Sequence, residues 1–193
     1  MRIVAGSHRG RRLEAPADER IRPTSDRIRE SLFNILDHRL GGFAGKRVLD
    51  GFAGTGALGF EALSRGAASA LFVDKDRAAL ALARRNAAAL DLTAKADFRL
   101  ADLTRPPQSA QQFDLILLDP PYGQGLAGSA LGALAAAGWL APDAVAVIEA
   151  DRAQPETIPD GFTTLDSRDY GRTRITLCAI RPKACRNVEP SAG

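Results

Sequence analysis

The chain has 193 residues, of which 45% are hydrophobic and 25% charged, and its formal net charge is +3. This length fits one domain with a full α/β core, and no stretch approaches the roughly 18 consecutive apolar residues of a membrane span. The N-terminus lacks the apolar region of a signal peptide, and the two cysteines, Cys178 and Cys185, lack zinc-type spacing. We therefore expect a reduced cytoplasmic protein without a bound metal, which excludes membrane and disulfide-rich secreted classes.

Positive charge is concentrated near the N-terminus. Residues 1–47 contain 11 Lys and Arg against 6 Asp and Glu, whereas the rest of the chain contains 15 against 17. Residues 2–12 carry four arginines and no acid. A basic arm on a nearly neutral body favours a polyanionic partner, and an ordinary solvated basic face is an equally good interpretation of charge alone.

The N-terminal residues are predicted to form a β-hairpin followed by a helix. Residues 2–14 alternate and turn around a loop that carries glycine and positive charge. After a proline-containing loop, Thr24 or Ser25 can cap a helix over 24–40, with Asp26 near the positive end of the helix dipole. Apolar residues then repeat at helical spacing, so one face of this helix is predicted to pack inward.

From residue 46 onward, predicted strands and helices alternate, which is typical of a parallel sheet with helices on both faces. Strands are expected at 47–50, 69–73, 95–100, 113–118 and 144–149, and helices at about 56–66, 75–90 and 125–138. Two further strands, 162–168 and 173–180, have no room for a helix between them, so they predict a hairpin at the sheet edge. The tail 182–193 is expected to be disordered.

Residues 48–59, with the sequence VLDGFAGTGALG, are predicted to run from a buried strand through a glycine-rich turn into a helix. Glycine lets the backbone approach a ligand, and a helix N-terminus presents free N–H groups, so the stretch predicts a nucleotide pocket. The spacing of Gly54, Gly56 and Gly59 also matches the dinucleotide fingerprint, which is weak by itself. Asp50 would repel a pyrophosphate but can accept hydrogen bonds from the ammonium of S-adenosylmethionine. It therefore favours a methyl donor over NAD.

Other residues are predicted to hold the same cofactor. Asp74 ends the second strand and can accept hydrogen bonds from ribose hydroxyls, and Asp102 can accept one from the adenine amino group. Arg22 and Thr24 can meet the carboxylate of the methionyl half. Helix or turn capping is the alternative role for these four residues. The full predicted cofactor set is Arg22, Thr24, Asp50, Phe52, Ala53, Gly54, Gly56, Asp74 and Asp102.

Asp119-Pro120-Pro121-Tyr122 follows directly on the apolar strand 113–118, at the edge where open α/β sheets bind ligands. The lone pair of an exocyclic amine is delocalised into its ring, so the amine must be oriented before it can attack a methyl group. The Asp119 carboxylate and the Pro120 carbonyl can accept hydrogen bonds from its two N–H groups, and Tyr122 offers a face for base stacking. An ordinary strand-to-loop turn is the alternative. About 70 residues after the glycine loop, this tetrapeptide predicts in-line methyl transfer to nitrogen, with positioning as the main contribution of the protein.

The glycine loop together with residues 119–122 resembles Rossmann-like S-adenosylmethionine-dependent methyltransferases that act on exocyclic amines. More narrowly, three stretches resemble the bacterial small-subunit rRNA guanine-N2 methyltransferases. These are Arg2-Ile3-Val4-Ala5-Gly6-x-x-Arg9-Gly10-Arg11-x-Leu13, the run 22–36 (RPTSDRIRESLFNIL), and Tyr170-Gly171-x-Thr173. The resemblance spans about residues 1–181, and the run 22–36 is its most specific part.

This resemblance implies methylation of N2 of one guanine in 16S rRNA, on an assembled or nearly assembled small subunit. We expect the protein to be a monomer. The resemblance implies an N-terminal hairpin that helps to hold RNA through Arg2, His8, Arg9, Arg11 and Arg12. It also implies a seven-stranded sheet whose last strand is antiparallel and inserted beside its neighbour. The domain is then 1–181, with the basic hairpin at 1–15, a helix region at 16–45 and the catalytic core at 46–181. Gly51 departs from the family pattern, where a larger apolar residue is expected, and this difference is expected to loosen the cofactor loop slightly.

The motif residues leave other functions open. An Asp- or Asn-Pro-Pro-Tyr motif also serves adenine N6, cytosine N4 and protein glutamine methylation, and nothing in residues 119–122 separates these acceptors. A nicotinamide oxidoreductase would use the glycine fingerprint but leave Asp119 without a role. A non-catalytic RNA-binding assembly factor would tolerate loss of Asp119 or Gly54, and both are present.

Overall fold

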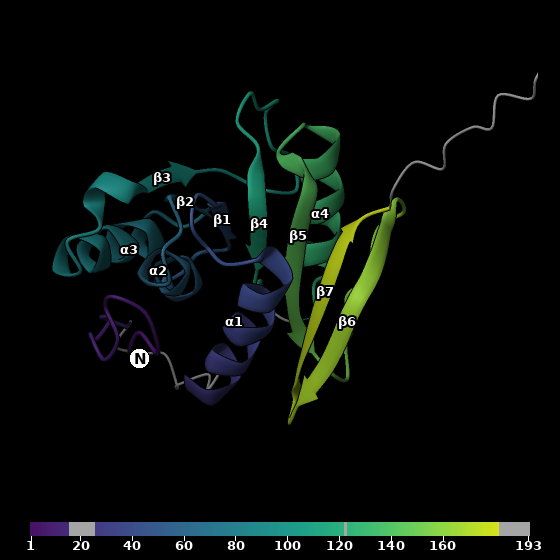
Figure 1. The fold of residues 1–193 in the computed structure, drawn as a ribbon. Coiled ribbons are helices and arrows are strands. Elements are labelled where there is room, and N and C mark those ends of the chain that lie inside the picture. The colour runs from purple at the N-terminus through teal and green to yellow at the C-terminus, as the bar shows by residue number, and fades with distance from the viewer. Residues whose placement is uncertain (16–25, 122, 182–193) are drawn as a thin grey trace, which may run out of the picture.

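The computed structural model describes residues 1–15, 26–121 and 123–181 (Figure 1). The predicted site residues Arg22, Thr24 and Tyr122 and the predicted disordered tail 182–193 lie outside the described residues. In chain order the elements are α1 (Asp26–Leu40), β1 (Arg47–Gly51), α2 (Ala57–Ser64), β2 (Ser69–Asp74), α3 (Arg77–Ala89), the 3-10 turn η1 (Thr93–Lys95), β3 (Ala96–Leu100), β4 (Phe113–Leu118), α4 (Leu126–Ala136), β5 (Leu140–Asp151), β6 (Phe162–Tyr170) and β7 (Thr173–Ile180).

The seven strands form one sheet in the order β3-β2-β1-β4-β5-β7-β6 (Figure 1). The pairs from β3 to β5 are parallel, whereas β7 runs antiparallel to both β5 and β6. This confirms the predicted, mostly parallel sheet with an inserted antiparallel last strand. The strand order reverses direction between β1 and β4, and such a switch point is where open α/β sheets bind ligands.

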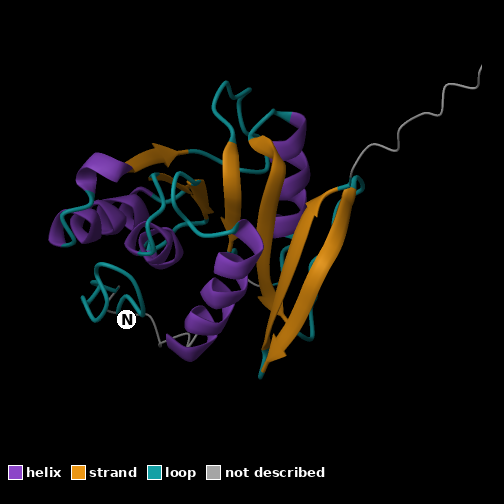
Figure 2. Cartoon of the chain, in the orientation of Figure 1, coloured by secondary structure: helices purple, strands orange, loops and turns teal. Residues whose placement is uncertain are grey.

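Helices cover both faces of the sheet, as the alternation predicts (Figure 2). One apolar core joins α1, α2 and α3 to the sheet around Phe33, Phe60 and Phe72, and the ring centroids of the last two are 4.5 Å apart. The other core packs α4 against the opposite face around Leu131 and Trp139. None of the described helices is long and apolar enough to span a bilayer.

Strand β5 begins earlier than the predicted 144–149 segment. Its first residue, Leu140, pairs with Phe113, and the register then shifts before Leu115 pairs with Val145. Pro142 lies inside this irregularity and is exposed. Sequence alone predicts that a strand stops at such a proline, whereas a bulge allows the strand to continue past it.

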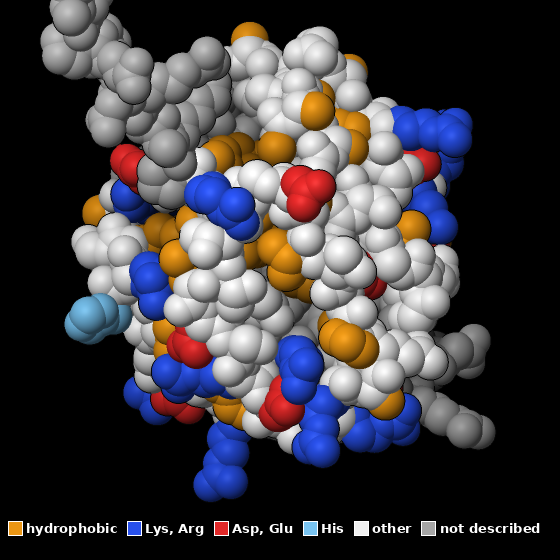
Figure 3. All heavy atoms as spheres, turned by 90° about the vertical axis from the view of Figure 1, so that its right-hand side faces the viewer, with side chains coloured by type: hydrophobic (Ala, Val, Ile, Leu, Met, Phe, Trp, Pro, Cys, Tyr) orange, Lys and Arg blue, Asp and Glu red, His pale blue; other side chains and the backbone are white. Residues whose placement is uncertain are grey.

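One edge of the sheet is β6, and its charged side chains oppose pairing with another strand. Arg168 lies 3.0 Å from Asp166, and Arg174 of β7 lies 2.7 Å from Asp169. Figure 3 shows this face, where Lys and Arg side chains are interspersed with Asp and Glu. Because opposite charges pair here, this edge is a weaker candidate for polyanion binding than residues 2–12, which carry four arginines and no acid.

The N-terminal arm, residues 1–15, packs against the side of α2. The predicted hairpin is not confirmed as a pair of strands: these residues contain one isolated antiparallel bridge, between Arg2 and Arg12. The fully buried Glu61 carboxylate accepts the backbone N–H groups of Val4 and Ala5 at 2.8 and 3.1 Å. An unpaired buried carboxylate would be costly, so these bonds tie the arm to the helix.

Glycine at position 6 allows the arm to approach α2 this closely. Its φ is +81°, and a Cβ there would lie 1.9 Å from the backbone oxygen of Ser64. Ser64 in turn accepts the N–H of Ser7 at 2.8 Å and donates its hydroxyl to the carbonyl of Ala5 at 2.6 Å. The arm is therefore fitted to one side of the helix that begins at the glycine loop.

Gly51, the departure noted in the sequence, leaves no void at the end of β1. A Cβ at this position would lie 2.5 Å from Leu103 Cδ1 and 2.8 Å from Leu118 Cδ2. Both leucine side chains are buried, so they occupy the space that a larger residue would fill. The expectation that Gly51 loosens the cofactor loop therefore has no support in the packing.

We predict that Gly51→Ala lowers the free energy of unfolding by about 1–3 kcal/mol, because an added methyl group overpacks this site. Chemical denaturation with circular dichroism measures the change. The matched variant is Gly51→Ala combined with Leu103→Ala, which removes the clashing methyl group and should cost less than the sum of the two single changes. Full additivity of the two changes would contradict this packing.

Candidate functional site

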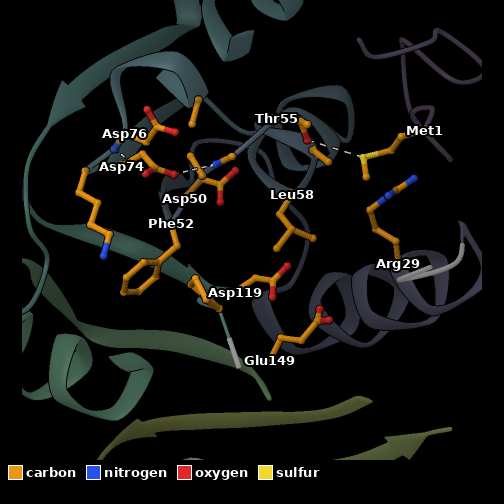
Figure 4. A pocket seen from close by; sticks show the side chains of 16 residues that line it. Met1, Arg29, Asp50, Phe52, Thr55, Leu58, Asp74, Asp76, Asp119 and Glu149 are labelled. Atoms are coloured by element: carbon orange, nitrogen blue, oxygen red, sulfur yellow. Dashed lines mark hydrogen bonds between the residues drawn. The ribbon is translucent and has the colours of Figure 1, made fainter. Parts of the chain in front are cut away.

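A cavity of about 430 Å³ opens at the switch point between β1 and β4 (Figure 4). Its wall combines the glycine loop, the end of β2, the ends of β4 and β5, the first turns of α1 and α2 and the start of the N-terminal arm. The lining residues are Met1, Arg29, Asp50, Phe52, Ala53, Gly54, Thr55, Ala57, Leu58, Asp74, Lys75, Asp76, Ala79, Asp119, Pro121 and Glu149. Six residues predicted from sequence are therefore brought together: Asp50, Phe52, Ala53, Gly54, Asp74 and Asp119.

The glycine loop forms one side of the cavity and has an unusual backbone conformation. Phe52 has a φ of +60°, which is sterically unfavourable for a bulky residue, and such strain concentrates at ligand sites. The loop is held in place by a hydrogen bond from the N–H of Ala53 to the carbonyl of Val73, at 3.1 Å. Because the loop is fixed to β2, its backbone is preorganised to face a ligand.

Asp74, at the end of β2, connects the glycine loop to the next helix. Its Oδ2 accepts the N–H of Gly54 at 3.0 Å, and its Oδ1 accepts the N–H of Asp76 at 2.9 Å. Asp76 caps α3 by accepting the N–H of Ala78. Each carboxylate oxygen has a second lone pair, so Asp74 can still accept hydrogen bonds from the hydroxyls of a ligand in the cavity.

Asp50 is a buried carboxyl group at the end of the central strand β1 and is only 2% exposed. Its Oδ2 accepts the N–H of Gly59, in the first turn of α2, at 2.8 Å. Burial raises the pKa of Asp50 to about 8, because desolvation disfavours the charged form; the Gly59 N–H opposes this rise, and the negative charge of Asp74 adds to it. A cationic group placed in the cavity would favour the ionised form of this carboxyl group.

Asp119 lies directly beyond β4, and Pro120 is buried behind it. Asp119 and the following Pro121 line the cavity, whereas Tyr122 lies outside the described residues. In Figure 4 the Asp119 side chain lies on the opposite side of the cavity from Asp74. A substrate group held at Asp119 would therefore face a ligand that contacts the glycine loop.

Two lining residues that the sequence analysis did not assign are Arg29 of α1 and Glu149 of β5. Both side chains are buried, with 2% and 3% exposure. Each was detectable as a charge within an apolar pattern, because Arg29 precedes Leu32 and Leu36 at helical spacing and Glu149 follows the apolar run 144–148. An Arg or Glu is seldom buried without a partner, so this mismatch is itself a signal of a site.

The Arg29 guanidinium is held between the N-terminal arm and α1. Its Nη2 donates to the carbonyl of Arg2 and to Asp26 Oδ1, the latter at 2.9 Å. Its Nε is buried and has no hydrogen-bond partner among the described residues. In Figure 4 Arg29 lies beside Met1, on the far side of the cavity from Asp74. The guanidinium therefore supplies positive charge at one end of a cavity otherwise rich in carboxylates.

Two predicted cofactor residues do not line the cavity. Gly56 begins α2 with a φ of +80°, and a Cβ there would lie 2.5 Å from a ring carbon of Phe60, so its role in the structure is to permit the turn. Asp102 is exposed and accepts from the N–H and hydroxyl of Thr104 at 2.9 and 2.7 Å. These bonds to Thr104 lower the pKa of Asp102. Its contact with adenine stays a prediction.

The residues predicted to bind RNA lie on the N-terminal arm, next to the cavity. Arg2, Arg9, Arg11 and Arg12 are exposed, and His8 is half-buried. Some of this charge is used internally, since Arg2 Nε pairs with Asp26 Oδ2 at 2.7 Å and Arg11 donates to the carbonyl of Ala89. Met1, at the start of the arm, lines the cavity, and the contact of the arm arginines with RNA stays a prediction.

Comparisons with known proteins agree along most of the chain. The family model described as "Conserved hypothetical protein 95" matches residues 1–179. A Haemophilus influenzae protein named Ribosomal RNA small subunit methyltransferase D is 35% identical over 175 residues, which cover 89% of this chain and 89% of that protein. An Escherichia coli protein of the same name is 36% identical over 151 residues, covering 78% and 75%. The solved structure of yhhF from Escherichia coli matches with a TM-score of 0.80 at 31% identity, covering 95% of this chain and 99% of that one.

The raised pKa of Asp50 predicts a specific dependence of stability on pH. The folded protein keeps a proton on Asp50 up to about pH 8, whereas the unfolded chain releases it near pH 3.8. The stability that this group contributes is therefore present below pH 4 and is lost as the pH rises toward 8. Relative to Asp50→Asn, whose amide oxygen can still accept the Gly59 N–H, the wild type should lose at most about 1.4 kcal/mol per pH unit across this range. Denaturation at several pH values measures the free energy of unfolding of both proteins. A difference between them that stays constant with pH would contradict the assignment.

Proposed function

The chain belongs to the family described as conserved hypothetical protein 95, and from this membership and the geometry of the cavity we propose that it methylates N2 of one guanine in 16S rRNA of the small ribosomal subunit. The names of the Haemophilus influenzae and Escherichia coli relatives support rRNA of the small subunit as the substrate. The observation that carries the proposal is the meeting of two motifs at one cavity: the glycine loop with Asp50 and, from the adjacent strand, Asp119. The choice of guanine N2 as the methyl acceptor rests on the resemblance of the sequence to the guanine-N2 methyltransferases.

The residues of the cavity fit S-adenosylmethionine as the methyl donor. The volume of about 430 Å³ lies within the range of small-ligand sites, about 300–1,000 Å³. Asp50 can face the ammonium group, Asp74 can accept hydrogen bonds from the ribose hydroxyls, and no phosphate has to be placed among these acids. When bound, S-adenosylmethionine supplies an electrophilic methyl group whose C–S bonding pair stays on sulfur as the new N–C bond forms.

The protein contributes orientation and desolvation to this reaction. The Asp119 carboxylate and the carbonyl of Pro120 accept hydrogen bonds from the two N–H groups of the target amine. These bonds direct the lone pair of the amine toward the glycine loop. An aromatic amine is too weak an acid to lose its proton before attack, so the nitrogen releases one proton after it gains the methyl group. We also propose Tyr122 as the surface on which the base stacks.

The N-terminal arm is proposed to hold the RNA through Arg2, His8, Arg9, Arg11 and Arg12. Support comes from its acid-free sequence over residues 2–12, the exposure of its arginines and the place of Met1, at its start, in the cavity wall. Phosphate contacts supply much of the affinity of proteins for RNA without reading sequence. We propose that the protein acts as a monomer in the cytoplasm on the small subunit or a late assembly intermediate.

The direct test incubates the protein and S-adenosylmethionine carrying a labelled methyl group with small subunits that lack the modification. Digestion of the rRNA to nucleosides should place the label on N2-methylguanosine at one position. Label on N6-methyladenosine or N4-methylcytidine would contradict the proposed acceptor while leaving the reaction class intact. Transfer of label to no rRNA nucleotide, with binding of S-adenosylmethionine retained, would contradict an rRNA substrate.

Variants of Asp119 test the mechanism in the same assay. Asp119→Ala should abolish turnover and leave cofactor binding nearly intact. Asp119→Asn should keep activity lowered by about one to two orders of magnitude, or about 1.4–2.7 kcal/mol, because an amide oxygen still accepts the amine hydrogen bond. If the Asn variant were as inactive as the Ala variant while binding both substrates, Asp119 would act as a base.

In addition to the predicted Arg22 and Thr24, Arg29 is proposed as a partner of the cofactor carboxylate. The cofactor has one anionic group, five of the seven charged residues that line the cavity are acids, and the buried Arg29 has an Nε without a hydrogen-bond partner among the described residues. A guanidinium–carboxylate hydrogen bond is among the stronger polar contacts in proteins.

This role predicts a selective change in ligand affinity. Calorimetry should show that the wild type binds S-adenosylmethionine roughly 10- to 100-fold more tightly than its decarboxylated form, since hydrogen bonds to charged groups contribute about 1.5–3 kcal/mol. In Arg29→Met this preference should disappear while affinity for the decarboxylated ligand changes little. Arg27→Met, on the exposed side of α1, is the matched control. Equal weakening of both ligands would mean that Arg29 only holds the arm.

A further inference from the structure

Three acidic residues lie near the carboxyl ends of three adjacent strands. Asp50, Asp119 and Glu149 stand at the carboxyl ends of β1, β4 and β5, which are neighbours in the sheet. All three line the same cavity. In the proposed transfer Asp50 faces the cofactor and Asp119 orients the amine, but Glu149 has no role. An additional buried acid beside the reacting amine therefore needs a role of its own.

Register places Glu149 next to Asp119. Leu118 of β4 pairs with Ile148 of β5, so the following residues, Asp119 and Glu149, come next in the same parallel alignment. Side chains alternate along strands, and Leu117 and Val147 belong to the core cluster on the α1 side of the sheet. Two positions further along the chain, both carboxylates project to that same side. Figure 4 shows them side by side, on the wall opposite Asp74.

The order of the strands sets the order of groups across the cavity. The glycine loop follows β1, Asp119 follows the adjacent β4, and Glu149 belongs to β5, one strand further from the loop. Neighbouring strands are about 4.8 Å apart. A flat base whose amine is held at Asp119 and faces the loop therefore extends its next ring atom toward Glu149.

The chemistry of the three candidate bases differs at that next atom. On the Watson–Crick edge of guanine the neighbour of the N2 amine is N1–H, a hydrogen-bond donor, whereas the acceptor N3 flanks the amine on the sugar side. In adenine the neighbour of N6 is N1, and in cytosine the neighbour of N4 is N3; both of these ring nitrogens are acceptors. An ionised glutamate can only accept hydrogen bonds, so it complements guanine and opposes the other two bases.

Building on the proposed methyl transfer, we propose that Glu149 selects guanine: its carboxylate accepts a hydrogen bond from N1–H of the base whose N2 amine is held by Asp119. Glu149 then reads the Watson–Crick edge of the target, while Asp119 orients the reacting nitrogen. The side chain is only 3% exposed, so water competes little for this hydrogen bond, and a mismatched acceptor would stay unsatisfied. Glu149 would thus discriminate between guanine, adenine and cytosine, which the Asp-Pro-Pro-Tyr sequence does not.

The test uses small subunits reconstituted with rRNA that carries either guanine or 2-aminopurine at the mapped position. 2-Aminopurine keeps the reactive N2 amine, but its N1 is an unprotonated acceptor. The wild type should methylate guanine about 100-fold or more faster than 2-aminopurine, because sites built around one hydrogen bond reject analogues that lack it. Glu149→Gln can donate its amide N–H to the N1 acceptor, so it should lose rate on guanine and gain rate on 2-aminopurine, narrowing or reversing the preference.

Matched controls separate a reading role from a structural one. Asp151→Asn neutralises a carboxylate on the same strand, two residues further on and outside the cavity lining, and should keep the wild-type preference. Affinity for S-adenosylmethionine, measured in parallel, should be unchanged in Glu149→Gln. Equal loss of rate on both bases in that variant would overturn the inference, as would a wild type that methylates adenine or cytosine. A wild type that methylates no rRNA would instead contradict the proposed function.

Discussion

The hydrogen bond from the Gly59 N–H to the buried Asp50 carboxyl group is the contact on which the site depends. It joins the end of the central strand to the first turn of α2, and the glycine loop lies between these two points. Desolvation raises the pKa of Asp50 to about 8, so the protein maintains an unfavourable group at this position. A cationic ligand would compensate for that cost. The same residue therefore shapes the loop and favours the ligand that the loop holds.

A second set of buried polar contacts ties the N-terminal arm to this loop. Asn86 of α3 donates to the carbonyl of Thr55 in the loop at 3.0 Å and exchanges hydrogen bonds with the backbone of Glu14. Glu61 holds the other end of the arm to α2. The proposed RNA-binding surface and the proposed cofactor pocket are thus parts of one rigid arrangement, which positions the substrate relative to the methyl donor.

The sequence predicted those features that depend on local pattern. Alternating apolar runs located the strands, and the positions of Asp50 and Asp119 at strand ends indicated a shared cavity, which the structure contains. Features that depend on packing were missed. Arg29 and Glu149 are detectable as charges within apolar patterns, but a single sequence does not show that the buried face on which they lie opens on a cavity. The expected effect of Gly51 was unsupported because the compensating Leu103 lies 52 residues away in the chain.

We propose that the cofactor lies across the carboxyl ends of β2, β1 and β4 with its sulfur facing Asp119. A crystal structure of the protein with S-adenosylhomocysteine, the product of the transfer, tests it most directly. We expect the ribose hydroxyls at Asp74, the ammonium group beside Asp50 and the carboxylate at Arg29. A ligand bound in the opposite direction, with its ribose beside Asp119 and its carboxylate at Lys75, would contradict the account.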